Sequence, residues 1–259
     1  MRTVIDQLHR EVKIPSGPLR IVSVVPSLTE LLFDLGLQDE IVGITKFCIH
    51  PAEEVAEIPK IGGTKNLNIA KIIALQPNII FANKEENTKE QIEELSAHFP
   101  VFITDIATID DALQAIELIG VAVNKKHAAD YLVVKIKQEI LQLPAQKKQK
   151  AIYLIWKKPY MCAGADTYIT QMMKIASFEN CIIENRYPAI TVEEIIALQI
   201  DILLLSNEPY PFAQKDVDEL QAQLPSTKII IVDGEMFSWY GSRMLHAPKY
   251  FINLQHQIQ

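Results

Sequence analysis

The pentapeptide Ile-Ile-Ala-Leu-Gln occurs twice in this 259-residue chain, at 72–76 and at 195–199. The flanking residues agree as well, with NIAKIIALQPNIIFAN at 68–83 and TVEEIIALQIDILLLSN at 191–207. In each copy an amphipathic stretch typical of a helix is followed by a short break and then by an apolar run typical of a buried strand. One helix–strand unit is therefore written twice, which predicts two similar halves.

The pattern around each copy alternates strand and helix. In the first half we expect strands at 20–25, 41–45, 78–82 and 101–104, with helices at 29–36, 69–75 and 88–99. In the second half we expect strands at 151–156, 181–184, 201–205 and 228–232, with helices at 166–176, 191–198, 213–223 and from about Ser242 onward. Because alternating β and α elements form mainly parallel sheets, the predicted fold class is α/β, with two β/α sandwich lobes.

The segment 109–143 separates the two halves and reads differently. It contains no Pro, Gly120 is its only Gly, and its apolar residues recur at helical spacing. We therefore predict one backbone helix of about 50 Å, at ~1.5 Å per residue. The predicted domains are an N-terminal lobe at 1–108, the interlobe helix at 109–143 and a C-terminal lobe at 144–259, with a ligand cleft between the lobes.

Composition limits the environment and the partners. A net charge of −7 and a pI near 5.4 argue against nucleic acid as a partner. Three cysteines without a C-x-x-C pair predict reduced thiols. The sequence contains no run of eighteen apolar residues, so we expect no membrane insertion. As written, the start lacks the apolar core of a secretory signal, so we expect a cytoplasmic protein, or a periplasmic one if the true start lies upstream or a leader was removed.

Signatures of catalysis are absent from the sequence. It has no G-x-S-x-G, P-loop or H-E-x-x-H motif. Cys48-Ile49-His50 could place two metal ligands near each other, but Cys48 also suits a small buried position, so we assign no metal ligand. We expect a monomeric binding protein, not an enzyme, with no catalytic residues and no covalently bound cofactor.

Aromatic and cationic residues gather where the predicted strands end. Ligands of open parallel sheets bind beyond the carboxyl ends of the strands. The loops at these positions contain Phe47, Lys84, Trp156, Lys157, Arg186, Tyr187 and Trp239. Rings offer flat faces to a planar ligand, and cations can bind carboxylates or amide oxygens, so these loops are the candidate binding surfaces. Any single one of these residues could instead have a structural role, packing at the end of a strand.

Five stretches together resemble a known family: RIVSVVPSLTELLFDLG, GGTKNLNIAKIIALQPNIIFAN, the long helical segment, TVEEIIALQIDILLLSN and DGEMFSWYGSRML. They resemble the helical-backbone substrate-binding proteins of ABC importers, in the branch that binds cobalamin and iron-siderophore complexes. The resemblance implies capture of a cobalamin-like, siderophore or haem chelate between two lobes. It implies ligand-binding roles in the N-terminal lobe for Pro26, Ser27, Phe47, Thr64, Lys65, Asn83 and Lys84. It implies the same in the C-terminal lobe for Trp156, Lys157, Arg186, Tyr187, Glu235, Trp239 and Tyr240.

The resemblance also implies a permease partner, bound through one surface Glu on each lobe. Glu193, two residues before the second IIALQ, is the expected docking residue, whereas the equivalent residue before the first copy is Ala70. This mismatch keeps an alternative open, a cytoplasmic corrinoid- or tetrapyrrole-binding protein, or an enzyme of tetrapyrrole or metal metabolism, without a transporter. An interaction scaffold is a third possibility.

Overall fold

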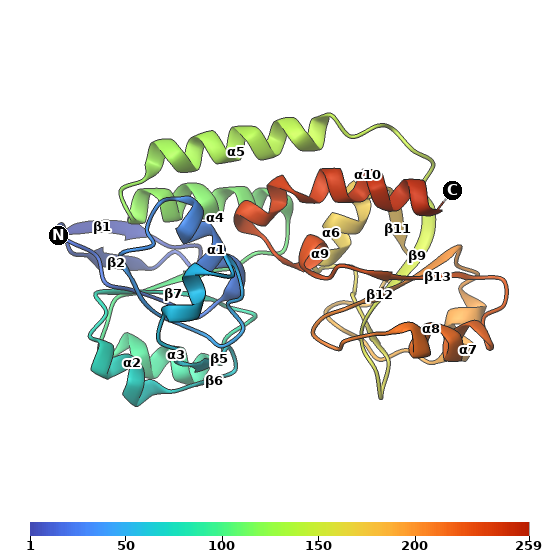
Figure 1. The fold of residues 1–259 in the computed structure, drawn as a ribbon, viewed down its shortest axis with the longest axis horizontal. Helices are drawn as coiled ribbons and strands as arrows, with labels where there is room; N and C mark the ends of the chain where they lie inside the picture. Colours follow the sequence, from blue (N-terminus) through green and yellow to red (C-terminus); the bar gives the residue numbers. More distant parts are fainter. Residues whose placement is uncertain (259) are drawn as a thin grey trace. The chain divides into compact units, whose positions relative to one another are not determined.

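The computed structural model of the chain describes residues 1–258 and groups them into two units (Figure 1). Unit 1 contains Met1–Ile106, Asp110–Lys137 and Tyr240–Leu245. Unit 2 contains Ala107–Ile109, Gln138–Trp239 and the stretch from His246. Neither unit is one continuous stretch of sequence, because a short C-terminal segment belongs to unit 1.

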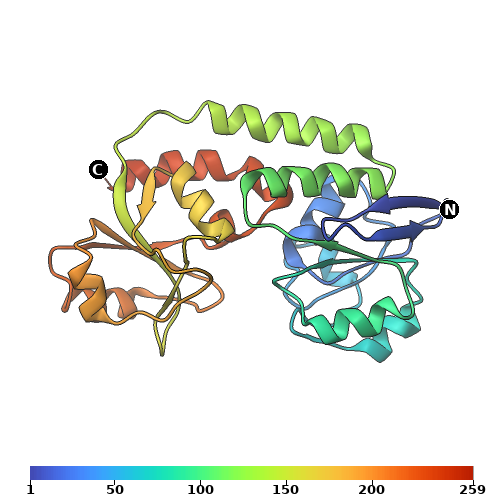
Figure 2. The same ribbon diagram turned by 180° about the vertical axis from the view of Figure 1, so that it is seen from behind.

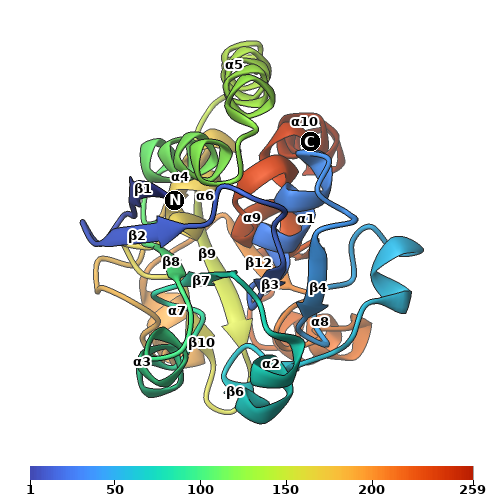
Figure 3. The same cartoon turned by 90° about the vertical axis from the view of Figure 1, so that its left-hand side faces the viewer.

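The sheet of unit 1 has four parallel strands in the order β4–β3–β7–β8 (Figure 3). Its strands are β3 (Ile21–Ser23), β4 (Ile41–Ile44), β7 (Ile79–Asn83) and β8 (Val101–Thr104). The helices α1 (Pro26–Asp34), α2 (Ile69–Leu75) and α3 (Lys89–Ser96) connect them, with shorter elements η1 (Glu54–Glu57), β5 (Gly62–Gly63) and β6 (Asn66–Leu67) between β4 and α2. Every residue of β3, β7 and β8 is buried, as expected for a parallel sheet covered on both faces.

An antiparallel hairpin precedes this sheet, in a region where the sequence analysis assigned no element. Strands β1 (Arg2–Ile5) and β2 (Glu11–Ile14) pair along their full lengths. The buried carboxylate of Asp6 accepts hydrogen bonds from the Leu8 and Arg10 amides and from the Arg10 guanidinium, which fixes the turn.

The segment 109–143 forms two helices, so the prediction of one continuous helix is wrong. α4 (Ile109–Ala122) and α5 (Lys126–Leu141) lie side by side as a helical hairpin (Figure 2). Asn124 adopts a left-handed conformation with φ 60°, which ends α4 and reverses the chain. A Cβ atom on Gly120 would lie 2.3 Å from the Cβ of Ala129, so the close approach of the two helices requires glycine there.

The sheet of unit 2 is built around β9 (Gln149–Trp156), which is parallel to β12 (Ile202–Ser206), which in turn is parallel to β13 (Lys228–Val232). β10 (Met161–Cys162) pairs antiparallel with the end of β9, and β11 (Phe178–Asn180) pairs parallel with its start. The helices of this part of the chain are α6 (Tyr168–Ile175), α7 (Val192–Ala197), α8 (Gln214–Gln221), α9 (Glu235–Ser238) and α10 (Ala247–Ile258). η2 (Gly241–Leu245), between α9 and α10, lies in unit 1.

The strand predicted at 181–184 is displaced by three residues, to β11. The Cys181 amide still donates to the Ala151 carbonyl, but the chain then leaves the sheet and Ile183 is 84% exposed. Its β-branched residues therefore misled the sequence analysis.

The repeated pentapeptide occupies equivalent positions in the two units. It ends α2 and α7, and its Gln is left-handed in both copies, with φ 47° at Gln76 and φ 48° at Gln199. Only the first Ile of each copy is core, because Ile72 and Ile195 are buried whereas the following Ile is exposed. The predicted α/β class with two similar parallel-sheet units is confirmed. None of the helices within residues 1–258 is both long enough and apolar enough to cross a bilayer.

Candidate ligand-binding surfaces

The predicted site residues fall into two sets, one in each unit. In unit 1 they surround the carboxyl ends of β3, β4 and β7. Pro26 and Ser27 are buried at the start of α1, and Asn83 is buried at the end of β7. Thr64 is half-buried, while Phe47, Lys65 and Lys84 are exposed.

Phe47 is the exposed aromatic residue of the unit 1 site set. Phe47 is 51% exposed, and its ring rests on Gly63, where a Cβ atom would lie 3.0 Å from the ring. The ammonium group of Lys46 lies 5.0 Å from the ring centroid. An exposed ring with a cation beside it can contact an apolar, anionic ligand.

Two asparagines fix the loop that follows β7. The Asn83 side chain accepts hydrogen bonds from the Glu85 and Glu86 amides and donates to Thr104. The Asn87 side chain donates to the carbonyls of Val24 and Thr64. Because Asn83 is only 2% exposed, it shapes the surface from beneath. Sequence reasoning missed Asn87, whose only signal was a second Asn four residues after the first.

The cations and the tyrosine of this surface have partners inside unit 1. The Lys84 ammonium lies 2.5 Å from the Asp105 carboxylate, and Lys65 donates to the Glu85 carbonyl. The Tyr240 hydroxyl donates to the Glu86 carboxylate at 2.6 Å, and burial raises the pKa of Tyr240 well above its usual value. Tyr240, which we expected in the C-terminal lobe, groups with unit 1.

Trp156 is the exposed aromatic residue of the unit 2 site set. It ends β9 with 41% of its surface exposed and meets Tyr210 edge-on, with ring centroids 5.7 Å apart. Tyr210 packs in turn on Phe212, whose centroid lies 4.7 Å away. The three rings form an aromatic cluster at the carboxyl ends of β9 and β12.

Lys157 is engaged by two carboxylates. Its ammonium lies 2.7 Å from both the Asp216 and the Glu219 carboxylates, and only 9% of the Lys157 side chain is exposed. Hydrogen bonds to these carboxylates raise the pKa of Lys157. Burial is the largest single influence on Asp216 and favours its protonated form, but the hydrogen bonds from Lys157 and the Ala213 amide, together with the nearby lysine charges, outweigh it and lower the pKa of Asp216. These groups form an ion triad that joins β9 to α8.

The half-buried carboxylate of Glu208 holds Trp239. One oxygen of Glu208 accepts hydrogen bonds from the Trp239 indole at 3.0 Å and from the Ser238 hydroxyl at 2.8 Å. Burial raises the pKa of Glu208 above its usual value. Glu235 begins α9 beside this group. The sequence analysis did not identify Glu208 as a site residue.

Arg186 and Tyr187 lie in the loop that follows β11. Arg186 has φ 66°, its amide donates to the Asp166 carboxylate at 2.5 Å, and its carbonyl accepts from the Gly164 amide. A Cβ atom on Gly164 would lie 2.7 Å from that carbonyl, so glycine is required for the close approach of the two loops. Arg186 is exposed and Tyr187 half-buried.

The predicted docking positions are on the surface. Glu193 is exposed in the first turn of α7, and Ala70 is exposed in the first turn of α2.

Cys48 is buried, with its sulfur 3.1 Å from the Thr29 hydroxyl and 3.2 Å from that of Thr45. Across residues 1–258, no three His, Cys, Asp or Glu side chains cluster in a way that could hold a metal ion.

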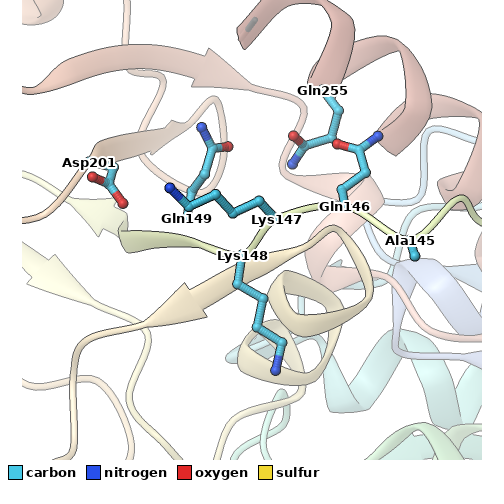
Figure 4. A pocket seen from close by; sticks show the side chains of 7 residues that line it. All are labelled: Ala145, Gln146, Lys147, Lys148, Gln149, Asp201 and Gln255. Carbon is cyan, nitrogen blue, oxygen red and sulfur yellow. The ribbon is translucent and has the colours of Figure 1, made fainter.

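A groove of about 410 Å³ lies in unit 2 at the amino ends of β9 and β12, the edge opposite the aromatic cluster. Its lining residues are Ala145, Gln146, Lys147, Lys148, Gln149, Asp201 and Gln255. Figure 4 shows the Lys147 and Lys148 side chains extending in different directions, so they do not converge on one anion.

Comparison with known proteins assigns a family to this arrangement. A model of the periplasmic binding protein family matches residues 21–227. An uncharacterized ABC transporter substrate-binding lipoprotein of Bacillus subtilis, YvrC, is 27% identical over 95% of this chain and 82% of its own length. The vitamin B12-binding protein of Pectobacterium atrosepticum is 23% identical over 90% of this chain and 86% of its own length.

The fold recurs in a solved structure. The periplasmic heme-binding protein RhuT from Roseiflexus superposes with a TM-score of 0.81 at 23% identity, covering 94% of this chain and all of that chain. The family match spans most of both units, including the repeated helix–strand unit and the Trp156 cluster. The chain belongs to the periplasmic binding protein family.

Proposed function

We propose that this protein captures a metal chelate of the cobalamin, haem or ferric-siderophore class and hands it to an ABC importer. The observation that carries the proposal is the exposed aromatic ring at the strand ends of each unit, Phe47 in unit 1 and Trp156 in unit 2. Rings left open to solvent beside a parallel sheet suit a large, partly apolar ligand.

The relatives support this choice of ligand class. Proteins similar to this chain bear the names vitamin B12-binding protein and heme-binding protein, and another is an ABC transporter lipoprotein. We propose the compartment of these relatives for this chain too, outside the cytoplasmic membrane. The alternative of an enzyme of tetrapyrrole or metal metabolism gains no support from these names.

Tryptophan fluorescence tests ligand capture directly, because the chain has two Trp residues and both lie in unit 2. Purified protein is titrated with cyanocobalamin, haemin and ferric siderophores, with free tryptophan amide as the inner-filter control. We expect one ligand to saturate with a Kd well below 100 µM. A Kd above about 100 µM for every ligand, which corresponds to about −5.5 kcal/mol, would contradict the proposal.

Two matched variants locate the ligand. Trp156→Phe removes the exposed indole, and Trp239→Phe removes the indole held by Glu208. If the ligand lies at the Trp156 cluster, the larger share of quenching is lost with Trp156→Phe. Phe47→Ala should lower affinity about tenfold, the loss of roughly 1.4 kcal/mol of apolar contact. Unchanged affinity in both Phe47→Ala and Trp156→Phe would place the ligand elsewhere.

For the transporter, we propose that the exposed Glu193 contacts the permease. Glu193→Ala should weaken coupling to the importer and leave ligand affinity intact. An equal loss of ligand affinity would place Glu193 in the binding site. Ala70→Glu is the complementary variant, because it adds a carboxylate at the equivalent position of α2 and should strengthen coupling if unit 1 docks in the same way.

A further inference from the structure

α5 has one buried face and one exposed apolar face. Ala129, Val133 and Ile136 are buried, and Ala129 packs against Gly120 of α4. α4 lies between α5 and the rest of unit 1 (Figures 1 and 3). On the opposite face, Tyr131 is 65% exposed and Val134 is 50% exposed.

Helical spacing extends this face along the whole element. Leu141, seven residues after Val134, is 84% exposed at the end of α5. Residues three and seven apart share a helix face, so Tyr131, Val134 and Leu141 form one line, which we call the α5 stripe. Nothing within residues 1–258 of unit 1 covers Tyr131 or Val134, which remain half or more exposed.

The α5 stripe lies on a basic helix of an acidic chain. α5 contains three Lys and two acidic residues, a charge of +1, whereas the whole chain carries −7. Lys135 lies on one side of the stripe and Lys137 on the other, where Lys126 also lies but pairs with Asp130 at 2.6 Å. The Lys135 ammonium lies 5.5 Å from the Tyr131 ring centroid.

We propose that the α5 stripe binds the surface of an anionic lipid bilayer. An exposed apolar line flanked by lysines is the pattern of helices that lie in a membrane interface, where tyrosine is favoured and lysine binds anionic headgroups. The charge complementarity identifies this occupant. Contact with a second copy would bring the lysines of two α5 helices together, and three side chains cover far less than the roughly 1,200 Å² of a stable interface.

The contact is weak and depends on salt. Each lysine near an anionic surface contributes about fivefold to partitioning, equivalent to about 1 kcal/mol. This interaction is screened as ionic strength rises. It acts independently of ligand capture, and it would hold the protein close to the membrane.

Vesicle co-sedimentation tests the proposal. The full chain is mixed with phosphatidylcholine vesicles with and without phosphatidylglycerol, at low and at high salt. We expect binding only to the anionic vesicles at low salt. Lys135→Gln/Lys137→Gln should lower the partition coefficient about 25-fold. Tyr131→Ser/Val134→Ser should lower it as well, because it removes the apolar line.

Lys89→Gln/Lys71→Gln is the matched control, because it removes the same charge from exposed sites on α3 and α2. It should leave vesicle binding within about twofold of the parent protein. Three results would overturn the proposal: equal binding to uncharged vesicles, equal loss in the control and in the α5 lysine variant, or a dimer in light scattering that Tyr131→Ser/Val134→Ser abolishes. Circular dichroism of each variant confirms that it is folded.

Discussion

Replacing Lys157 by Met separates a structural role of this residue from a ligand-binding one. The change keeps most of the apolar stem but removes the charge, which leaves the Asp216 carboxylate with a side chain that is 0% exposed and no cation beside it. Asp216 keeps its bond from the Ala213 amide, and Glu219, at 53% exposed, turns to water. We expect Lys157→Met to lower the free energy of unfolding by about 3 kcal/mol, the lower end for breaking a buried ion pair.

Urea unfolding followed by tryptophan fluorescence measures this loss in the right part of the protein, because both Trp residues lie in unit 2. Asp216→Asn should cost about 1.5 kcal/mol, since Lys157 keeps Glu219 as a partner. The double variant should cost less than the sum of the two, with a coupling of about 1–2 kcal/mol.

Glu219→Gln is the control, because Glu219 is the exposed partner and should cost under about 1 kcal/mol. The lowered pKa of Asp216 means that its contribution is present above its unfolded pKa and is lost as pH falls through the folded one. The raised pKa of Lys157 means that its contribution is lost only as pH rises through that value. The reasoning would be refuted if the losses in the free energy of unfolding of the two single variants simply added in the double variant, or if the contribution of the triad to stability changed between pH 6 and 8. If Lys157→Met is as stable as the parent protein but binds ligand more weakly, Lys157 serves the ligand.

Three further changes test other parts of the structure. Gly120→Ala should lower stability by about 2 kcal/mol through overpacking of the helical hairpin, measured by thermal circular dichroism, whereas Gly17→Ala, with nothing within 4 Å of the added Cβ, should not. Arg243→Met leaves the partly buried carboxylate of Glu30 without the guanidinium that binds it through two hydrogen bonds. Urea unfolding should show a loss of about 3 kcal/mol in the free energy of unfolding. Burial raises the pKa of Glu208, so its ionisation in the folded state lowers stability as pH rises from the unfolded value through the folded one. Glu208→Gln should therefore reduce the fall in melting temperature between pH 5 and 7, and an unchanged pH profile would contradict this account.

The sequence predicted the elements whose signals are local. The duplicated pentapeptide and its flanks predicted a helix, a break and a buried strand in both units, and the structure adds that the break is a left-handed Gln in each copy. The break between α4 and α5 was missed, because the apolar periodicity continues through it and Asn124, which tolerates a positive φ, gives only a weak signal.

The candidate surfaces were predictable in position but not in detail. Parallel topology places the residues after each strand at one edge, so Phe47 and Trp156 could be found from sequence. The partners of Lys157 could not, because Asp216 and Glu219 are about sixty residues away and only the fold brings them together. The ligand-binding and docking roles of individual residues stay predictions until the titrations above are made.

The placement of Tyr240–Leu245 in unit 1 affects the order in which the protein is completed during synthesis. Glu30 leaves the ribosome early, but Arg243, which binds it, follows 213 residues later. Since chains are made from the amino end, unit 1 waits until most of unit 2 has been made before its partly buried Glu30 carboxylate is neutralised. A nascent or truncated product that ends before Tyr240 would lack these six residues and would carry an uncompensated charge in unit 1.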